Sequence, residues 1–326
     1  MNYFSALHNL FIKRNPILIY HKPTLSCNCK CETCDTWSLD DENIMSLEMI
    51  FRLLEDARRS GIQNYTAWGG EPLLYSDLDK IFYHTKKMGM KNSICTNAYL
   101  LKEKTKEIAP NLDLALISID AIGEDHDRIR GVEGLYKKIL EGLEELRKYS
   151  KVRINIWTTI NPVSRYQIEE ILKVAEFYKV IVEFFPIAPI EGYNDKMILK
   201  KEELIDVFKE IKSLKNKDYP VGNTNYYLDL VINQKPFKCN FPLISLFVNP
   251  DGTIYTCEEG GARIIKKWGK YPELTLAKLL SSNEYHETVK KMENCNKCFL
   301  PCVGETSGFL PLQIIRKKIS ILNLSS

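Results

Sequence analysis

Residues 17–34 read Ile-Leu-Ile-Tyr-His-Lys-Pro-Thr-Leu-Ser-Cys-Asn-Cys-Lys-Cys-Glu-Thr-Cys. The first four residues, Ile17–Tyr20, form a short apolar run that is typical of a buried strand. Cys27, Cys31 and Cys34 follow it with the spacing C-x3-C-x2-C. Thiolates are soft ligands for zinc and for iron–sulfur clusters. This stretch therefore predicts a strand that ends in a metal-binding loop.

The cysteine loop permits two kinds of metal site. Three thiolates fit a four-iron cluster that keeps one iron free to bind a substrate or cofactor directly. With Cys29 as a fourth ligand, the same loop fits a tetrahedral zinc site. On spacing alone, both interpretations stay open.

The composition of the whole chain is that of a globular protein. Of its 326 residues, 44% are hydrophobic and 27% are charged. Lys and Arg number 45 against 42 Asp and Glu, a net charge of +3, so no nucleic-acid partner is expected. No apolar run reaches the roughly 18 residues of a membrane span, and signal-peptide features are lacking, so we expect a cytoplasmic protein. Ten cysteines in such a chain favour metal binding over disulfides.

Strand-like and helix-like segments alternate from about residue 17 to residue 215. Six β-then-α units in a row predict an α/β fold with a parallel sheet, either doubly wound or an open barrel. In such folds the site lies at the carboxyl ends of the strands. After Ile17–Tyr20, the expected strands are Tyr65–Trp68, Ser93–Thr96, Leu114–Ile119, Val152–Ile160 and Val180–Phe185. The expected helices are Met45–Ser60, Ile81–Lys87, Leu101–Ile108, Tyr136–Tyr149, Ile168–Phe177 and Glu202–Leu214.

The pattern changes after residue 215. Residues 216–236 are polar and turn-rich and are expected to be a linker. Residues 237–303 predict a small C-terminal α+β domain, and 304–326 a tail. Within the small domain we expect a hairpin of Leu243–Val248 and Thr253–Cys257, then helices over Leu274–Leu280 and Tyr285–Met292.

A second motif, Trp68-Gly-Gly-Glu-Pro72, ends the second expected strand. Paired glycines let a ligand approach the backbone closely, and Glu71 can accept a hydrogen bond from an ammonium group. Because parallel strands end at the same edge, this motif and the cysteine loop are expected to be neighbours.

With these motifs in order, about residues 15–215 resemble the radical S-adenosylmethionine (SAM) superfamily. Cys27, Cys31 and Cys34 match the ligands of its cluster, and Gly69, Gly70, Glu71 and Pro72 match the segment that binds the methionine amine. Further matches, which the resemblance places at SAM, are Thr96-Asn97-Ala98, Ser118-Ile-Asp120-Ala121, His126-Asp-Arg-Ile-Arg130-Gly131 and Phe185-Pro186-Ile187. Ala98 and Ala121 stand where the family has glycine.

The fifth strand carries four polar residues that the resemblance makes candidates for contacting the SAM ribose. They are Asn155, Thr158, Thr159 and Asn161. Strand alternation alone does not choose among them.

The resemblance implies a partial (βα)6 TIM-like barrel that holds a [4Fe–4S] cluster and SAM. It implies reductive cleavage of SAM to a 5′-deoxyadenosyl radical, which abstracts hydrogen from a substrate C–H bond. A low-potential electron donor such as flavodoxin or ferredoxin is the implied partner. The substrate class stays open among a peptide, a small metabolite and a lipid.

A second cysteine set lies near the carboxyl end. Cys239, Cys257, Cys295 and Cys298 can surround one metal, and zinc fits as well as iron–sulfur on spacing alone. The set looks like a Twitch domain, the shortened relative of the SPASM extension, which implies one auxiliary [4Fe–4S] cluster. Cys302 is close enough in sequence to be a further ligand. Cys29 and Cys95 have no assigned role, and Cys95 is expected to be a small buried residue.

Both ends of the chain carry apolar residues at helical spacing beside basic ones. The two sets are Tyr3, Phe4, Leu7, Leu10 and Phe11, and Leu312, Ile315, Ile319 and Leu322. Helices that pack on the barrel are the favoured interpretation, and contact with a membrane surface is the alternative.

Two other classes of protein compete with the enzyme interpretation. An iron–sulfur electron-transfer protein with two clusters would not bind SAM. A zinc-stabilised binding module would be colourless, whereas an iron–sulfur protein absorbs visible light.

Overall fold

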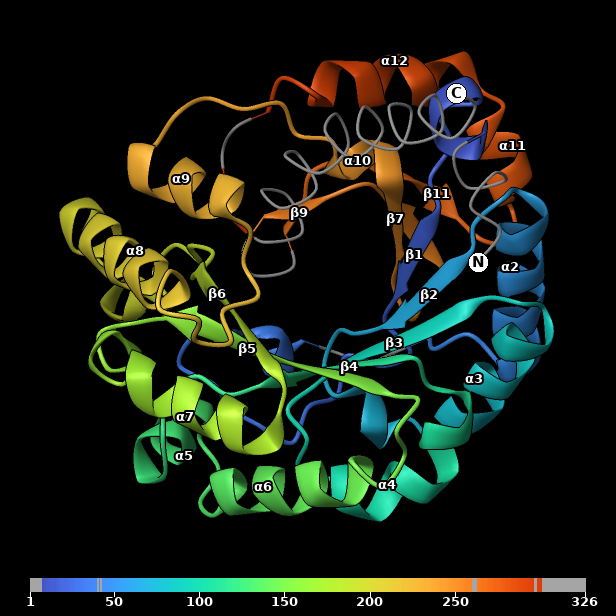
Figure 1. Cartoon of the computed structure of the whole chain (residues 1–326). Helices are drawn as coiled ribbons and strands as arrows, with labels where there is room; N and C mark the ends of the chain where they lie inside the picture. The colour runs from blue at the N-terminus through green and yellow to red at the C-terminus, as the bar shows by residue number, and fades with distance from the viewer. Residues whose placement is uncertain (1–7, 40, 42, 260–262, 296–297, 301–326) are drawn as a thin grey trace, which may run out of the picture.

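The computed structural model describes residues 8–39, 41, 43–259, 263–295 and 298–300. Six parallel strands, each hydrogen-bonded to the next in chain order, form the main part of the sheet. Figure 1 shows them curving into an open barrel. They are β1 (Leu18–His21), β2 (Asn64–Ala67), β3 (Lys91–Thr96), β4 (Leu114–Ser118), β5 (Arg153–Ile160) and β6 (Ile181–Pro186). The predicted partial barrel is confirmed.

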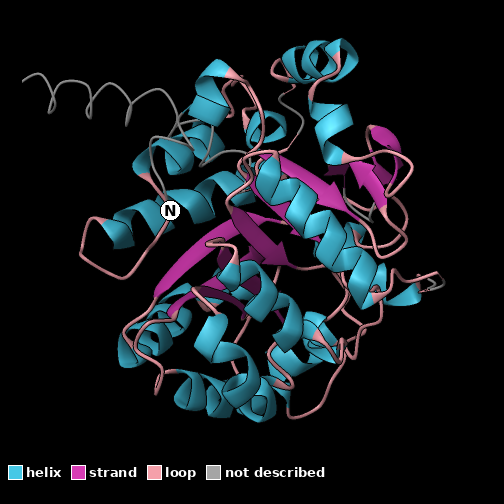
Figure 2. Ribbon diagram, turned by 90° about the vertical axis from the view of Figure 1, so that its right-hand side faces the viewer, coloured by secondary structure: helices cyan, strands magenta, loops and turns pink. Residues whose placement is uncertain are grey.

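Helices cover the outside of this sheet (Figures 1 and 2). They are α2 (Leu47–Arg59), α3 (Leu78–Lys87), α4 (Leu101–Ile108), α5 (Glu124–Arg130), α6 (Leu135–Leu146), α7 (Ile168–Tyr178) and α8 (Lys201–Lys215). The short helix α5, which carries part of a predicted SAM motif, is an addition to the expected set. The positive φ of Gly123 and of Gly131, +60° and +67°, bounds it at both ends.

Burial alternates along the strands and separates two faces. In β5, Ile154, Ile156 and Ile160 are buried on the helix side. Asn155 and Thr159 are only half-buried and face the barrel interior. The interior therefore carries the polar side chains that can meet a ligand.

The C-terminal region continues the same sheet. Strand β7 (Ser245–Val248) pairs in parallel with β1, and β8 (Thr253–Tyr255) returns antiparallel to β7 as the predicted hairpin. The remaining elements are β9 (Glu258–Glu259), β10 (Arg263–Ile264), β11 (Lys267–Lys270), α10 (Phe241–Ile244), α11 (Leu276–Leu280) and α12 (Asn283–Met292). The region expected as a small domain thus shares its main sheet with the barrel.

The stretch expected to be a linker contains a helix, α9 (Asn225–Asn233). The Thr224 side chain caps it by accepting from the Tyr227 backbone N–H, and Tyr227 and Leu228 are fully buried. Val221 also forms a parallel bridge to Val182 of β6. The buried side chains of α9 therefore hold this segment on the barrel, although its overall composition is polar.

No helix in the described ranges is long and apolar enough to cross a membrane. The amphipathic ends fall largely on residues 1–7 and 301–326, which lie outside the described part.

A buried carboxylate joins the barrel to the C-terminal region. Asp56 of α2 accepts a hydrogen bond of 2.6 Å from the backbone N–H of Leu276, at the start of α11. Asp56→Ala leaves that N–H buried without its partner, so we expect a loss of about 1–3 kcal/mol of unfolding free energy. Urea denaturation of the metal-free protein measures it. Asp206→Ala, at an exposed ion pair with Lys209, is the control; equal losses in the two variants would contradict this role.

Candidate active site

The predicted cysteine loop leaves β1 at the carboxyl edge of the sheet and is fastened by a residue that the motifs did not indicate. The Asp41 carboxylate accepts from the backbone N–H groups of Leu25 (2.9 Å) and Ser26 (3.2 Å) and from the Thr24 and Ser26 hydroxyl groups. These hydrogen bonds outweigh partial burial and lower the pKa of Asp41. The entry to the loop is thereby held by one side chain.

The structure brings the three predicted ligands of the first cluster into one pocket. Cys27, Cys31 and Cys34 line it together with residues from the ends of β2, β3 and β4 and from α5. The other lining residues are Cys29, Thr36, Trp37, Trp68, Gly69, Gly70, Cys95, Thr96, Asn97, Ser118 and Arg130. Cys95, expected to be a buried packing residue, is therefore half-buried at the pocket, where burial raises its pKa to about 12.

The thiols of the loop are not equivalent. Hydrogen bonding to Cys29 lowers the pKa of Cys27 to about 7 and also lowers the pKa of Cys31. Burial raises the pKa of Cys34. The Arg130 guanidinium lies 3.9 Å from the Cys31 sulfur and adds to the stabilisation of its thiolate. Cys29, without an assigned role in the sequence, lies between two predicted ligands.

Gly70 is required by the close approach of β2 to the cysteine loop. A Cβ atom there would lie 2.3 Å from the carbonyl oxygens of Leu25 and Ser26. The backbone N–H groups of Gly70 and Glu71 donate to the carbonyls of Thr24 (3.3 Å) and Ser26 (2.8 Å). Any side chain at this position would displace the loop that carries the thiols.

Glu71 is fully buried, and its carboxylate holds β2 to the end of β3. It accepts from the Thr96 hydroxyl (2.6 Å) and from the backbone N–H groups of Asn97 (2.7 Å) and Leu73 (2.9 Å). Burial raises its pKa to about 7 against the effect of these hydrogen bonds. The interaction of Glu71 with an ammonium group, considered from the sequence, would have to compete with these three contacts.

The end of β3 keeps its turn despite the departure from glycine. Ala98 has a φ of +62°, the left-handed conformation that glycine adopts most readily. The Asn97 amide donates to Asn28 (2.7 Å) and lies 3.8 Å from the Cys27 sulfur. This turn therefore also contacts the cysteine loop.

A buried ion pair joins β4 to α5. Arg130 Nη2 lies 2.5 Å from Asp120 Oδ2, and the Asp120 side chain is fully buried. Burial opposes the charge on Arg130, but Asp120 outweighs it and the pKa of Arg130 is raised. Asp120 Oδ1 also accepts from the Thr159 backbone and hydroxyl, at 2.9 and 2.6 Å.

The four polar candidates on β5 separate into two groups. Asn155 and Thr159 face the interior, whereas Thr158 donates to the Ile119 carbonyl and Asn161 accepts from two backbone N–H groups of its own turn. Phe185 lies edge-on to Trp157, with ring centroids 5.5 Å apart. These two rings form a wall on the β5–β6 side together with Glu183, which accepts from the Trp157 indole N–H at 2.5 Å.

The structure also brings the described members of the second cysteine set together. Burial, the largest cause, and the charges of Cys298 and Cys295 together raise the pKa of Cys239 to about 12. The same causes, with Cys239 included, raise the pKa of Cys257. Cys302 lies outside the described residues.

An ion pair lies between the two cysteine sets. Lys22, which follows β1, is 2.5 Å from the carboxylate of Glu258, the neighbour of Cys257, and both side chains are nearly buried. The ammonium group also lies 4.9 Å from the centre of the Trp68 ring at the first pocket. Sequence analysis missed this pair because its partners are far apart along the chain.

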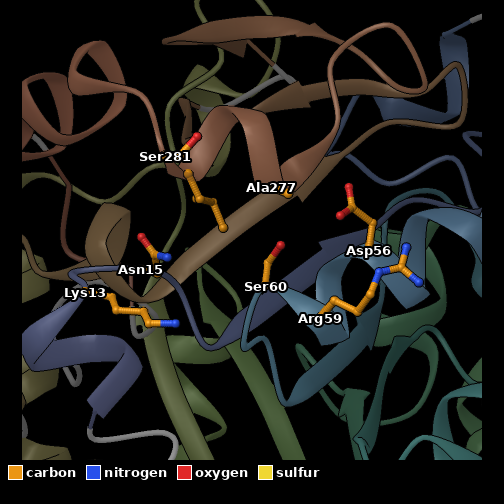
Figure 3. Close-up of a pocket in the computed structure, with 8 residues that line it drawn as sticks. Lys13, Asn15, Asp56, Arg59, Ser60, Ala277 and Ser281 are labelled. Atoms are coloured by element: carbon orange, nitrogen blue, oxygen red, sulfur yellow. The ribbon is translucent and has the colours of Figure 1, made fainter.

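A larger pocket, of about 320 Å³, lies elsewhere and carries none of the predicted residues (Figure 3). It is formed by Lys13 and Asn15 before β1, by Asp56, Arg59 and Ser60 at the end of α2, and by α11. It therefore lies toward the amino ends of the strands, away from the cysteine loop.

Within the described ranges, no three cysteine, histidine or acidic side chains are placed as ligands of a single metal ion.

The fold and the first pocket define a barrel protein whose three clustered thiols lie beside the paired glycines Gly69 and Gly70. Residues 22–178 match the family model described as the radical SAM superfamily. Residues 22–178, which hold the cysteine loop and strands β2 to β5, are therefore assigned to the radical SAM superfamily. Its members use a [4Fe–4S] cluster and SAM.

Relatives of known name support this assignment. The chain is 28% identical over 205 residues to the GTP 3',8-cyclase of Clostridium botulinum, covering 57% of this chain and 64% of the cyclase. It thus spans less than two thirds of the length of that relative.

Two solved structures share the fold. Streptococcus suis SuiB bound to S-adenosylmethionine has a TM-score of 0.71 at 17% identity, covering 89% of this chain and 72% of SuiB. The protein anSMEcpe with bound AdoMet has a TM-score of 0.67 at 20% identity, covering 89% and 88%. Other structures of these two proteins hold the precursor peptide SuiA and the Cp18Cys peptide.

The buried Asp120–Arg130 pair generates a prediction. Asp120→Asn leaves the Arg130 guanidinium buried without its counter-charge, so we expect a loss of about 3–5 kcal/mol of unfolding free energy. The control is Asp125→Asn, which removes an exposed partner of Arg128 in the same helix and should cost less than about 1 kcal/mol. Chemical denaturation of both variants measures the difference; a similar cost in the two would contradict the account of this pair.

Proposed function

We propose that this chain binds a [4Fe–4S] cluster through Cys27, Cys31 and Cys34, binds SAM beside it, and abstracts hydrogen from a substrate C–H bond. The observation that supports this best is that one pocket is lined by all three thiols, by Gly69 and Gly70, and by the ends of the next two strands. Three thiolates satisfy three irons and leave the fourth for a ligand, which suits this donor set. When bound there, the cluster supplies the electron that cleaves SAM to methionine and a 5′-deoxyadenosyl radical.

The pocket residues would hold SAM in place. The methionine part would lie along the Gly69–Gly70 backbone, which lines the pocket, while Arg130 offers a cation to its carboxylate. Thr96, Asn97 and Ser118 line the pocket as polar partners. Glu71 and Asp120 support this surface through Asn97 and Arg130.

The β5–β6 wall would serve the adenosyl end. Phe185 offers an apolar ring to adenine, and the Trp157–Phe185 pair excludes water from that side. An enclosed site matters because a carbon radical abstracts hydrogen from any C–H or S–H group that can reach it.

We further propose a Twitch-type auxiliary [4Fe–4S] cluster on Cys239, Cys257, Cys295 and Cys298, with Cys302 as a further candidate ligand. The Cys239 backbone N–H donates to the Glu293 carbonyl (2.9 Å), which places Cys239 beside the segment that carries Cys295 and supports a shared site. Such a cluster would accept an electron from the substrate radical or bind the substrate. The first cluster needs an electron to cleave SAM, so flavodoxin or ferredoxin is the proposed donor.

The names of the relatives suggest two substrate classes to screen. The cyclases act on GTP, and SuiB binds a precursor peptide, so a nucleotide and a peptide library are the first trials. In this screen, a compound that increases the release of 5′-deoxyadenosine is a candidate substrate.

Cleavage of SAM is the first test of this function. Anaerobically reconstituted protein with SAM and dithionite should release 5′-deoxyadenosine, measured by chromatography. The triple variant Cys27→Ala, Cys31→Ala, Cys34→Ala should release none, since it lacks the ligands. Cys95→Ala, which alters a pocket thiol outside the proposed ligand set, should keep the wild-type iron content. Iron-loaded wild-type protein that does not bind SAM would contradict the proposal and favour an electron-transfer protein.

The auxiliary site is tested by iron content. Cys257→Ala with Cys298→Ala should lower the iron per chain from about eight to about four, because one four-iron cluster is lost. The SAM-induced change in the electron paramagnetic resonance spectrum should persist in that variant. Unchanged iron, or zinc found by elemental analysis, would contradict an auxiliary iron–sulfur cluster.

A further inference from the structure

The loop that follows β6 reaches back to the cysteine loop. Residues 187–200 connect β6 to α8, and Tyr193 and Asn194 lie just before a short 3-10 helix, Asp195–Met197. Both side chains hydrogen-bond to the backbone of the cysteine loop, although more than 150 residues separate the two segments along the chain. No motif of the sequence indicated this contact.

Asn194 is fully buried and uses both ends of its amide. Its Nδ2 donates to the carbonyls of Thr33 (3.1 Å) and Ala188 (3.0 Å), and its Oδ1 accepts from the Ile190 backbone N–H (2.8 Å). The side chain therefore shapes its own loop and ties that loop to the segment between Cys31 and Cys34.

Tyr193 contacts the two cysteines that bound this segment. Its hydroxyl donates to the Cys31 carbonyl at 2.6 Å and lies 3.2 Å from the Cys34 carbonyl. It also accepts from Trp37 Nε1 at 3.0 Å, and Trp37 lines the pocket. One hydroxyl thus donates at one end of the Cys31–Cys34 segment and lies close to the carbonyl at the other end.

Both side chains bind backbone carbonyls of the cysteine loop, so they can fix the orientation of its peptide groups. The orientation of a peptide group sets the direction of the adjacent Cα–Cβ bond, and hence where a thiol lies. The segment has no helix or strand of its own, so its carbonyls depend on such donors.

We infer that Tyr193 and Asn194 are positioning residues that hold Cys31 and Cys34 in the geometry needed to retain the first cluster. The inference rests on the proposed function, since it requires a cluster on these cysteines. Neither side chain is assigned a contact with SAM or with the cluster. Their effect is on the backbone that carries two of the three ligands.

The test compares Tyr193→Phe and Asn194→Asp with wild-type protein. Tyr193→Phe removes one hydroxyl from a side chain that is 39% exposed, so the variant should fold. Asn194→Asp keeps the acceptor for Ile190 but turns a donor into an oxygen that faces the Thr33 carbonyl. Tyr166→Phe is the control, because its hydroxyl also makes a hydrogen bond, with Arg165, on the loop after β5.

The main readout is the anaerobic rate of iron transfer to a chelator. Iron released by the triple cysteine variant comes from other sites, and this amount is subtracted from that released by each of the other proteins. We expect Tyr193→Phe to lose iron about fivefold faster than wild type, the factor for one lost hydrogen bond, and Asn194→Asp to lose it faster still. Tyr166→Phe should match wild type. The electron paramagnetic resonance spectrum with SAM should change in the two loop variants, and the thermal midpoint of Tyr193→Phe should stay near that of the control.

The possible outcomes separate this inference from the proposed function. Wild-type iron loss and spectra in Tyr193→Phe and Asn194→Asp, with a normal cluster in wild type, would overturn the inference alone. A wild-type protein that holds no iron at Cys27, Cys31 and Cys34 would overturn both. Should Asn194→Asp fail to fold, Tyr193→Phe decides.

Discussion

The backbone of the Cys27–Cys34 segment has no helix or strand of its own, and the site depends on the hydrogen bonds that hold it. They come from several directions. Asp41 fastens the entry, the β2 turn binds the carbonyls of Thr24 and Ser26, and α5 accepts from the backbone of Lys30 and Glu32. The loop after β6 holds the remaining side. The barrel therefore acts as a rigid frame for a loop that would otherwise be flexible, which keeps reactive groups in register.

Charge is distributed to suit an electron-rich site. The Arg130 guanidinium lies next to the Cys31 sulfur, and the Asp120 carboxylate balances the charge of Arg130. Lys22 and Glu258 form a second nearly buried pair beside Trp68 and Cys257. Each pair would be costly if one partner were lost. The Lys22–Glu258 pair connects elements distant in sequence, so it also ties the C-terminal region to the barrel.

Sequence analysis predicted the parts of this protein that are encoded locally. The strand-like runs predicted the parallel barrel, which is confirmed, because apolar period and length are local signals. Most of the motif residues line one pocket, whereas Glu71, Pro72, Asp120 and Phe185 do not, and the role of the cysteines as ligands stays a prediction. Other features depend on the fold and could not be predicted. Asp41 and Tyr193 act through backbone groups elsewhere, β7 pairs with β1, and α9 is held by buried Tyr227 and Leu228 within a polar stretch. Glu71 belongs to a sequence motif, but only the structure shows that its carboxylate accepts hydrogen bonds from the end of β3.

The central claim is that three cysteines hold a cluster whose remaining iron is available to SAM. Mössbauer spectroscopy of protein reconstituted with iron-57 tests it most directly, because each iron site gives its own signal. The account predicts that SAM changes the signal of a single iron site in wild-type protein and changes nothing in the triple cysteine variant. An iron-loaded wild-type protein whose spectrum is the same with and without SAM would contradict it.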